Sequence, residues 1–423
     1  MRFLSDAYVP FEWNNPIARV AVPISHFVTE IPLVSVMTAY FMSVGMVAAI
    51  IVLIVFSTLT HLHFQWMLPV RIMRQVLFWC NVLFFPMLVP HCKMVFACLS
   101  YPAASYSIQP YYPDLVCWKD TYNGYFVLSL FIMVAIIAVN WLNTMCFYNA
   151  AIPNETQVHR LHMNAKYSGI TETALVTGKI IILAFATGGH TSGWRLPVGA
   201  LTFLFGCAST YHIVSAMVWW HDTTMALFIF KALILTWTGC IAMLTVPLGD
   251  TYELGLVYYL MLPVLFITAH LMLRWRCLNI LSLAAHDLDS PLLAILKIRC
   301  IMRSFILWLS IFDGQYVEMN AQVQERIDKR NFLISHIIEL ATNRFPNSAD
   351  LHILCSMYSM TVKSDQELAY RSLRLAEQAG EDLDNRFRCD VIRRALDAAA
   401  DEEMSEELRK YTEFKAKKEV SPH

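Results

Sequence analysis

Four ionisable side chains in the apolar part of the chain have the types and spacing that could bind an anion. They are Lys179, His212, Lys231 and His270, one in each of four successive apolar stretches. Each lies about seven residues from the same end of its stretch, a depth of about 10 Å at 1.5 Å per residue. No Asp or Glu lies at that depth. We therefore expect one cationic layer that could hold an anionic solute or a lipid headgroup.

A simpler interpretation of these four residues requires no ligand. A lysine near a bilayer interface can place its ammonium among the headgroups while its stem stays in hydrocarbon. A histidine inside a membrane often bonds to a carbonyl of a neighbouring helix. Such packing is the commoner outcome, so both interpretations stand at this point.

The cysteines and histidines predict one disulfide and no metal site. Eleven cysteines occur without CxxC or a zinc-type spacing, and the pairs His61/His63 and His159/His162 lack a nearby carboxylate. Cys98 and Cys117 bracket the loop YPAASYSIQPYYPDLVC, where a disulfide is expected if the loop faces an oxidising compartment. We find no phosphate loop, nucleophile elbow or paired acids, so we predict no catalytic residues, metal or other cofactor. A membrane-embedded enzyme acting on lipid is therefore the weakest of the functional hypotheses.

The composition is that of a membrane protein. Of 423 residues, 57% are hydrophobic and 15% charged, with a mean hydropathy of +0.47, against about 45–50% and about 25% in soluble domains. Lys and Arg total 32 against 33 Asp and Glu, so no basic field favours nucleic acid. The lipid bilayer is the partner that this composition predicts.

Seven stretches are long and apolar enough to cross a bilayer, which takes about 20 residues. Positive charges stay cytoplasmic, and they gather in the loops after the first, third and seventh stretches (Arg71 and Arg74; Arg160 and Lys166; Arg274 and Arg276). We expect an integral plasma-membrane protein with an outer N-terminal segment (1–31), no cleaved signal peptide and a cytoplasmic C-terminus. The stretches are 32–57, 74–98, 124–148, 173–191, 195–219, 223–246 and 252–276, which together form a predicted bundle over 32–277.

The next segment, 278–315, contains PLLAILKIRCIMRSFILWLSIFD. Lys297, Arg299 and Arg303 interrupt its apolar run, and central cations are costly in hydrocarbon. We expect an amphipathic helix at the inner interface with these cations toward anionic headgroups. An eighth span is the alternative.

From residue 316 to 423 the pattern predicts soluble amphipathic helices. The first, 316–343, ends before Pro346, and its inner face is expected to hold Phe332, Leu333, Ile337, Leu340 and Ala341. Two more helices, 384–400 and 402–418, are expected near the end of the chain.

Between these helices the sequence predicts an antiparallel pair. Its first member is capped by Asn347 or Ser348, and its second opens with a capping box of Ser364 and Glu367 and closes at Gly380. Large apolar residues on the first member face small residues on the second, as in tetratricopeptide-like repeats. We expect Leu351, Leu354, Tyr358 and Leu373 to line a groove for a protein partner. The apolar faces are Leu351, Leu354, Cys355 and Tyr358, then Ala369, Leu373 and Ala376.

The phrase FPNSADLHILCSMYSM followed by SDQELAYRSLRLAEQ resembles the tiny macrocysts protein family and the N-terminal half of the multipass adenylate and guanylate cyclases of parasitic protists. In both, Phe-Pro-x-Ser-x-x-Leu-x-x-Leu opens a helix pair beside a multipass block. The matching residues are Phe345, Pro346, Ser348, Leu351 and Leu354. No cyclase or PAS-type sensor domain is visible in these residues, so cyclase activity is not carried over.

The predicted fold is therefore all-α, with a bundle of about seven spans followed by a cytoplasmic, tetratricopeptide-like helical region. The leading functional hypothesis is a sensor or receptor-like protein that couples the bundle to a cytoplasmic protein partner or output domain, such as the regulatory half of a cyclase-type protein. A transporter or channel for an anionic solute is the alternative. Association into a homo-oligomer is left open.

Overall fold

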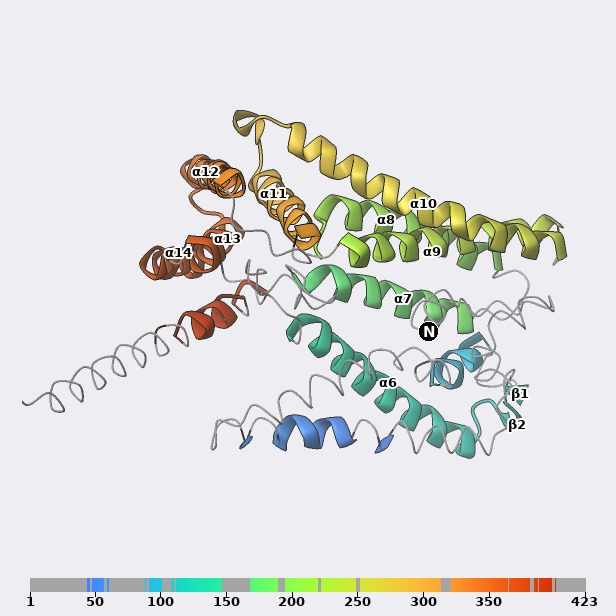
Figure 1. The fold of residues 1–423 in the computed structure, drawn as a ribbon. Coiled ribbons are helices and arrows are strands. Elements are labelled where there is room, and N and C mark those ends of the chain that lie inside the picture. The colour runs from blue at the N-terminus through green and yellow to red at the C-terminus, as the bar shows by residue number, and fades with distance from the viewer. Residues whose placement is uncertain are drawn as a thin grey trace, which may run out of the picture. The chain divides into compact units, whose positions relative to one another are not determined.

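A computed structural model of the 423-residue chain gives the fold (Figure 1). The structure describes residues 44–45, 48–56, 59–60, 88, 91–100, 108–109, 112–146, 168–188, 195–219, 222–248, 252–312, 321–363, 365–380, 384–386, 388–397 and 400. These residues are helical apart from their connections and one small hairpin. They divide into two compact units, which are described separately. Unit 1 comprises 1–148, 169–216 and 225–273, and unit 2 comprises 149–168, 217–224 and 274–423.

Five described helices are long and apolar enough to cross a membrane. They match the third to seventh predicted spans, whereas most of the first two predicted spans lies outside the described residues. Large apolar side chains such as Val127, Phe131 and Leu260 are exposed on these helices, as lipid contact requires. The helices are α6 (Asp120–Cys146), α7 (Ile170–Gly188), α8 (Arg195–Ala216), α9 (Asp222–Leu248) and α10 (Tyr252–Ser282).

Successive apolar helices pack as antiparallel neighbours. The Trp141 indole of α6 donates to Thr177 of α7 at 3.1 Å, and the Trp237 indole of α9 donates to the Tyr258 carbonyl of α10 at 3.3 Å. Between α8 and α9 the backbones approach closely, since a Cβ added at Gly239 would lie 2.4 Å from the Phe203 nitrogen. Small residues at such crossings allow close helix packing where no hydrophobic effect operates between helices.

A disulfide-linked hairpin precedes α6. Cys98, in the 3₁₀ turn η1 (Ala97–Ser100), is bonded to Cys117, as the sequence suggested, with an S–S distance of 2.08 Å. Strands β1 (Ile108–Gln109) and β2 (Tyr112–Val116) pair antiparallel between the two cysteines. The Tyr122 hydroxyl donates to the Met94 carbonyl at 2.9 Å, which joins the start of α6 to the preceding helical turn.

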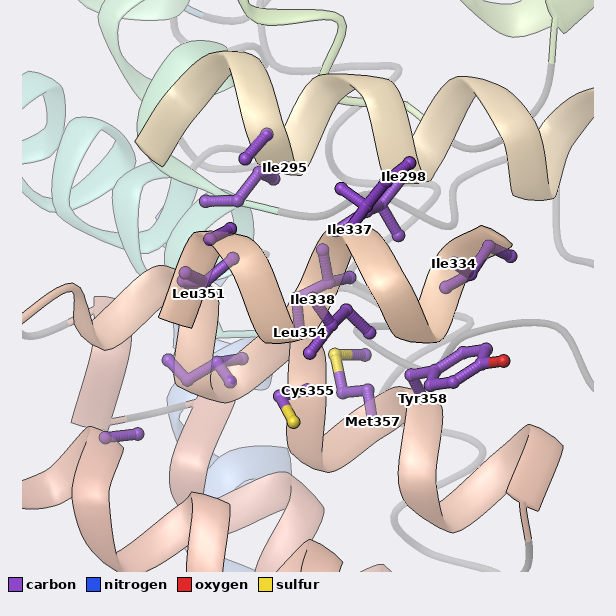
Figure 2. Packing of buried hydrophobic residues seen from close by; sticks show 14 of the residues in the cluster. Ile295, Ile298, Ile334, Ile337, Ile338, Leu351, Leu354, Cys355, Met357 and Tyr358 are labelled. Carbon is purple, nitrogen blue, oxygen red and sulfur yellow. The ribbon is translucent and has the colours of Figure 1, made fainter. Parts of the chain in front are cut away.

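Unit 2 is a helical assembly with its own apolar core. The last turns of α10 lead through η4 (Ala285–Asp287) to α11 (Pro291–Phe312) and α12 (Ala321–Arg344). Next come α13 (Ala349–Tyr358), the π-helical segment η5 (Ser359–Lys363) and α14 (Gln366–Ala379). Side chains of α11, α12, α13 and α14 share one buried cluster, part of which is shown in Figure 2. Further helical residues lie within 384–397, whereas the predicted helix 402–418 lies outside the described residues.

The pair α13 and α14 is antiparallel, as expected. The Ser356 hydroxyl donates to the Ala369 carbonyl at 2.8 Å, and the Ser372 hydroxyl donates to the Cys355 sulfur at 3.3 Å. Gly380 ends α14 with φ −138°, so it is needed for space and not for a left-handed conformation. A Cβ there would lie 2.7 Å from the Cβ of Ala349, the first residue of α13, which lies at the same end of the antiparallel pair.

The capping predictions were partly wrong. Ser348 is the N-cap residue of α13, but its side chain makes no capping hydrogen bond. The N-cap of α14 is Asp365, whose carboxylate accepts from the Leu368 amide at 2.9 Å, and not Ser364. Serine and aspartate both cap helices well, and the three-residue spacing from Ser364 to Glu367 favoured Ser364 over its neighbour Asp365 in the prediction.

Candidate functional site

Three of the four predicted anion-binding residues, His212, His270 and Lys231, each contact a different residue. His212 Nε2 lies 3.2 Å from the Thr171 hydroxyl, across the α7–α8 contact. His270 Nδ1 lies 3.1 Å from the Phe266 carbonyl one turn earlier in α10. The Lys231 ammonium lies 5.5 Å from the centre of the Phe228 ring. The two histidines contact a hydroxyl of the next helix and a carbonyl of their own helix, whereas the simpler interpretation named a carbonyl of a neighbouring helix.

The antiparallel register gives the depth of each of the four residues. Gly178 of α7 meets Phe205 of α8, and Gly206 of α8 meets Thr236 of α9. Lys179 is therefore level with the stretch of α9 near Thr236, about five to seven residues from Lys231, or roughly 10 Å along the axis.

The other two residues of the set lie nearer to Lys231. By the same register His212 is almost level with Lys231. Phe230 of α9 packs against Phe266 of α10 with ring centres 5.4 Å apart, so Phe266 is about level with Lys231. His270 follows Phe266 by four residues and therefore lies about one helical turn from the level of Lys231, in the direction away from Lys179. The four groups do not share one layer, and the expected cationic layer was wrong in this respect. Only His212 and Lys231 remain at a common depth.

The residues predicted to bind a protein partner lie inside unit 2. Leu351 and Leu354 are fully buried, and Tyr358 and Leu373 are 1% and 2% exposed. All four belong to the core cluster to which α11, α12, α13 and α14 contribute side chains, and Figure 2 shows Leu351, Leu354 and Tyr358 within it. The Tyr358 hydroxyl donates to the Asn331 carbonyl of α12 at 3.1 Å. These side chains hold the helices of unit 2 together and offer no surface to another protein in this structure.

Helix α12 has an apolar strip on its exposed side. The predicted inner face was wrong for Phe332, Leu333 and Leu340, which are 74%, 42% and 41% exposed. The buried face is instead Ile334, Ile337, Ile338 and Ala341. His336 stacks on Phe332 with ring centres 6.3 Å apart. We call Phe332, Leu333, His336 and Leu340 the α12 strip; they share an arc of about 100° because an α-helix turns 100° per residue.

Two cations of α11 are buried, contrary to the expected orientation toward headgroups. Lys297 is 6% and Arg299 3% exposed. The Lys297 ammonium donates to the Leu283 carbonyl, and the Arg299 guanidinium donates to the Met217 carbonyl. Burial lowers the pKa of Lys297, and the nearby Asp287 carboxylate opposes that shift. Backbone carbonyls therefore take the role that the sequence assigned to anionic lipid.

The Arg299 contact fixes the segment between α8 and α9 onto α11. Met217, with φ 44°, turns the chain directly after α8, and the next two residues, Val218 and Trp219, are 4% and 1% exposed. The sequence offered no sign of this contact, since 82 residues separate the two partners. A helix of unit 2 thus holds the connection between two apolar helices.

No group of three His, Cys, Asp or Glu within the part of the chain that the structure describes could hold a metal ion. The paired histidines His61/His63 and His159/His162 lie outside that part. Comparisons with protein-family models, curated proteins and solved structures found no match.

Proposed function

We propose that this protein is a multipass membrane sensor whose apolar helices act on a cytoplasmic helical unit that binds a protein partner. The single observation that carries the proposal is the hydrogen bond from Arg299 to Met217. Any movement of α8 or α9 that displaces residues 217–219 must either break this hydrogen bond or move Arg299 and α11 as well. The folded core of α11 to α14 supplies a unit that could pass such a displacement to its surface.

Two features support the orientation with unit 2 in the cytoplasm. The Cys98–Cys117 disulfide lies at the start of α6, and disulfides persist in oxidising compartments. The five successive antiparallel helices α6 to α10 would place the end of α10 on the side of the membrane opposite to the disulfide. Arg274 and Arg276 lie near that end, and positive charges of this kind stay on the cytoplasmic side. The two signals are independent of each other.

The α12 strip is the surface that we assign to the partner. Its apolar side chains are bordered by charges of both signs, including the Glu325–Lys329 ion pair at 2.6 Å and exposed Glu339. The occupant that fits is an amphipathic helix of another protein, with its own apolar stripe between charges of both signs. Helix pairs of the tetratricopeptide-like kind that the sequence predicts for α13 and α14 bind protein segments, which agrees with this role.

An anion transporter is the weaker alternative. It depended on four cationic groups at one depth, and the register separates Lys179 from His270 by more than two helical turns. No second observation in the described bundle favours a solute path.

A photocrosslinking amino acid at position 332 of the full chain, in its native membrane, tests the proposal. We expect a discrete protein adduct at 332 that is lost in Leu340→Glu and is absent when the crosslinker replaces Arg371, an exposed residue of α14. Adducts only to lipid, only to a second copy of the chain, or to nothing would each contradict a partner helix on the α12 strip.

A further inference from the structure

The connector between α10 and α11 is bound by a side chain at the end of α12. This connector, residues 283–290, includes η4 and leads into the first residue of α11. One terminal nitrogen of the Arg344 guanidinium donates to the His286 carbonyl at 3.2 Å and to the Leu288 carbonyl at 3.1 Å. The other donates to the Asp289 carboxylate at 3.1 Å. Arg344 therefore binds three positions of a segment that lies 55 to 58 residues earlier in the chain.

The fork shape of the guanidinium explains how one side chain reaches all three acceptors. Its nitrogens are fixed in one plane, whereas a lysine ammonium offers a single point. The Arg344 and Asp289 side chains are 50% and 82% exposed, and ion pairs this exposed contribute little. The bonds to the two carbonyls do not depend on that pair, and the one to Leu288 is partly buried. We therefore expect the carbonyl bonds to hold the connector and the carboxylate to add little.

The same connector is anchored at two other points. The Leu288 side chain is 3% exposed and belongs to the core cluster of unit 2. The Lys297 ammonium of α11 donates to the Leu283 carbonyl, at the start of the connector. The start of the connector is thus held by α11, whereas its middle and end are held by α12 through Arg344.

Arg344 is also part of the helix that carries the α12 strip. It is the last residue of α12, and Leu340 of the strip precedes it by about one helical turn. The amide of the next residue, Phe345, still donates to the Ala341 carbonyl at 2.8 Å, as in a continuing helix. A displacement of the connector must therefore either move this end of α12 or break the bonds to Arg344.

We propose that Arg344 couples the α10–α11 connector to α12, so that the end of α10 regulates the α12 strip through this side chain. The proposal rests on the function proposed above, because the strip is the surface that is regulated. It gives unit 2 a second input, since Arg344 binds the segment after α10 whereas Arg299 binds the segment after α8.

Hydrogen–deuterium exchange of the full chain in nanodiscs tests the binding of the connector without any partner. Arg344→Met removes the donors and keeps an aliphatic stem. We expect amide exchange in 285–289 and 341–345 to become at least about tenfold faster, because three bonds from a charged donor are lost, while exchange in α14 stays unchanged. Asp289→Asn removes only the exposed ion pair and should change these rates by less than about twofold. Parent-like exchange in Arg344→Met would overturn the proposal.

A second substitution tests transmission through Arg344. Ala284 is the N-cap residue of η4 and has extended backbone angles (φ −74°, ψ 160°) that glycine also adopts, so Ala284→Gly loosens the connector without removing a bond. In the parent we expect this change to speed exchange in 341–345 by about two- to fivefold, whereas in Arg344→Met it should add nothing there. Equal effects of Ala284→Gly in the two backgrounds would show that the connector does not act on α12 through Arg344.

The photocrosslinking amino acid at position 332 then tests regulation of the strip. In the native membrane we expect Arg344→Met to lower the yield of the protein adduct by at least about twofold, as the loss of a coupling residue implies. Arg371→Met, which removes an exposed arginine of α14, should leave the yield as in the parent. An unchanged yield in Arg344→Met would overturn the regulation and leave the proposed function in place. Absence of the adduct in the parent would refute the proposed function, and the exchange experiments would still decide whether Arg344 couples the connector to α12.

Discussion

The guanidinium of Arg299 donates a hydrogen bond to the backbone carbonyl of Met217, 82 residues earlier in the chain. Both partners are buried, at 3% and 1% exposure. A hydrogen bond from a charged donor in such a place contributes about 1.5–3 kcal/mol, and its loss leaves a buried carbonyl without that donor. This contact joins the chain segment after α8 to α11 within unit 2.

Arg299→Met should loosen this link without unfolding unit 2. Methionine keeps most of the buried volume and removes the donor, so we expect amide exchange in 217–219 to become at least about tenfold faster, as a loss near 1.4 kcal/mol implies. Exchange in α13 and α14 should stay unchanged. Hydrogen–deuterium exchange of the full chain in nanodiscs measures both regions.

A control for that prediction is Arg371→Met, on the exposed face of α14. It removes the same charge from the surface and should leave exchange in 217–219 as in the parent. Faster exchange across all of unit 2 in Arg299→Met would mean that the arginine stabilises the core as a whole, contrary to the specific link.

The opposite faces of α12 should respond differently to truncation. Ile337 is fully buried, and Ile337→Ala should lower the free energy of unfolding of unit 2 by about 2–5 kcal/mol through lost burial and a cavity. Phe332 is 74% exposed, and Phe332→Ala should change the free energy of unfolding of unit 2 by no more than about 0.5 kcal/mol. Pulse proteolysis in urea of each full-length variant provides the comparison. A large effect of Phe332→Ala would show that a part of the chain outside the described residues covers the α12 strip.

The sequence predicted the apolar helices well, and for a physical reason. A bilayer leaves no water to satisfy backbone groups, so an apolar stretch of sufficient length has to be a helix. The predicted span 223–246 and the observed Asp222–Leu248 differ by only one or two residues at each end. The predicted span 252–276 ended too early, because α10 continues to Ser282 through Arg274 and Arg276.

The predictions from sequence were wrong where the contact that decides a side chain's position is made by a residue far away in the chain. They were also wrong where two faces of one helix carry similar apolar residues. The cations of α11 were assigned to lipid because their carbonyl partners, Met217 above all, are invisible to local pattern. In α12 apolar residues occur on both sides of the helix, so periodicity alone could not decide whether Phe332 or Ile334 is buried. The depth of Lys179 was misjudged because it depends on the register with α8, which is set by close contacts such as Gly178 with Phe205.

The buried amine of Lys297 predicts a pH dependence of stability. Its folded pKa lies below the ordinary value of 10.5, mainly through burial. Between the two pKa values the unfolded chain binds more protons than the folded chain, so stability increases as pH rises toward 10.5 and decreases as pH falls through the folded pKa. Lys297→Met removes this group.

We therefore expect the difference in unfolding free energy between the parent and Lys297→Met to shift in favour of the parent as pH increases from 8 to 10. Urea unfolding of both chains at several pH values measures it. A difference that is constant, or that shifts the other way, would show that the Lys297 pKa is not lowered by folding.

Gly239 and Gly124 form a matched pair for testing the packing of the apolar helices. Both are inside helices, α9 and α6, but a Cβ at Gly239 would lie 2.4 Å from the Phe203 nitrogen and 2.8 Å from the Gly199 oxygen, whereas nothing lies within 4 Å at Gly124. Backbone atoms cannot move aside as a flexible side chain can, so Gly239→Ala must force α8 and α9 apart at a cost of about 1–3 kcal/mol. Gly124→Ala gains helix propensity, up to about 1 kcal/mol, without a clash. Thermal unfolding in one detergent should lower the midpoint for Gly239→Ala and leave it equal or higher for Gly124→Ala. Equal midpoints would mean that α8 and α9 are not in backbone contact at this position, and the register that separates Lys179 from Lys231 would have to be revised.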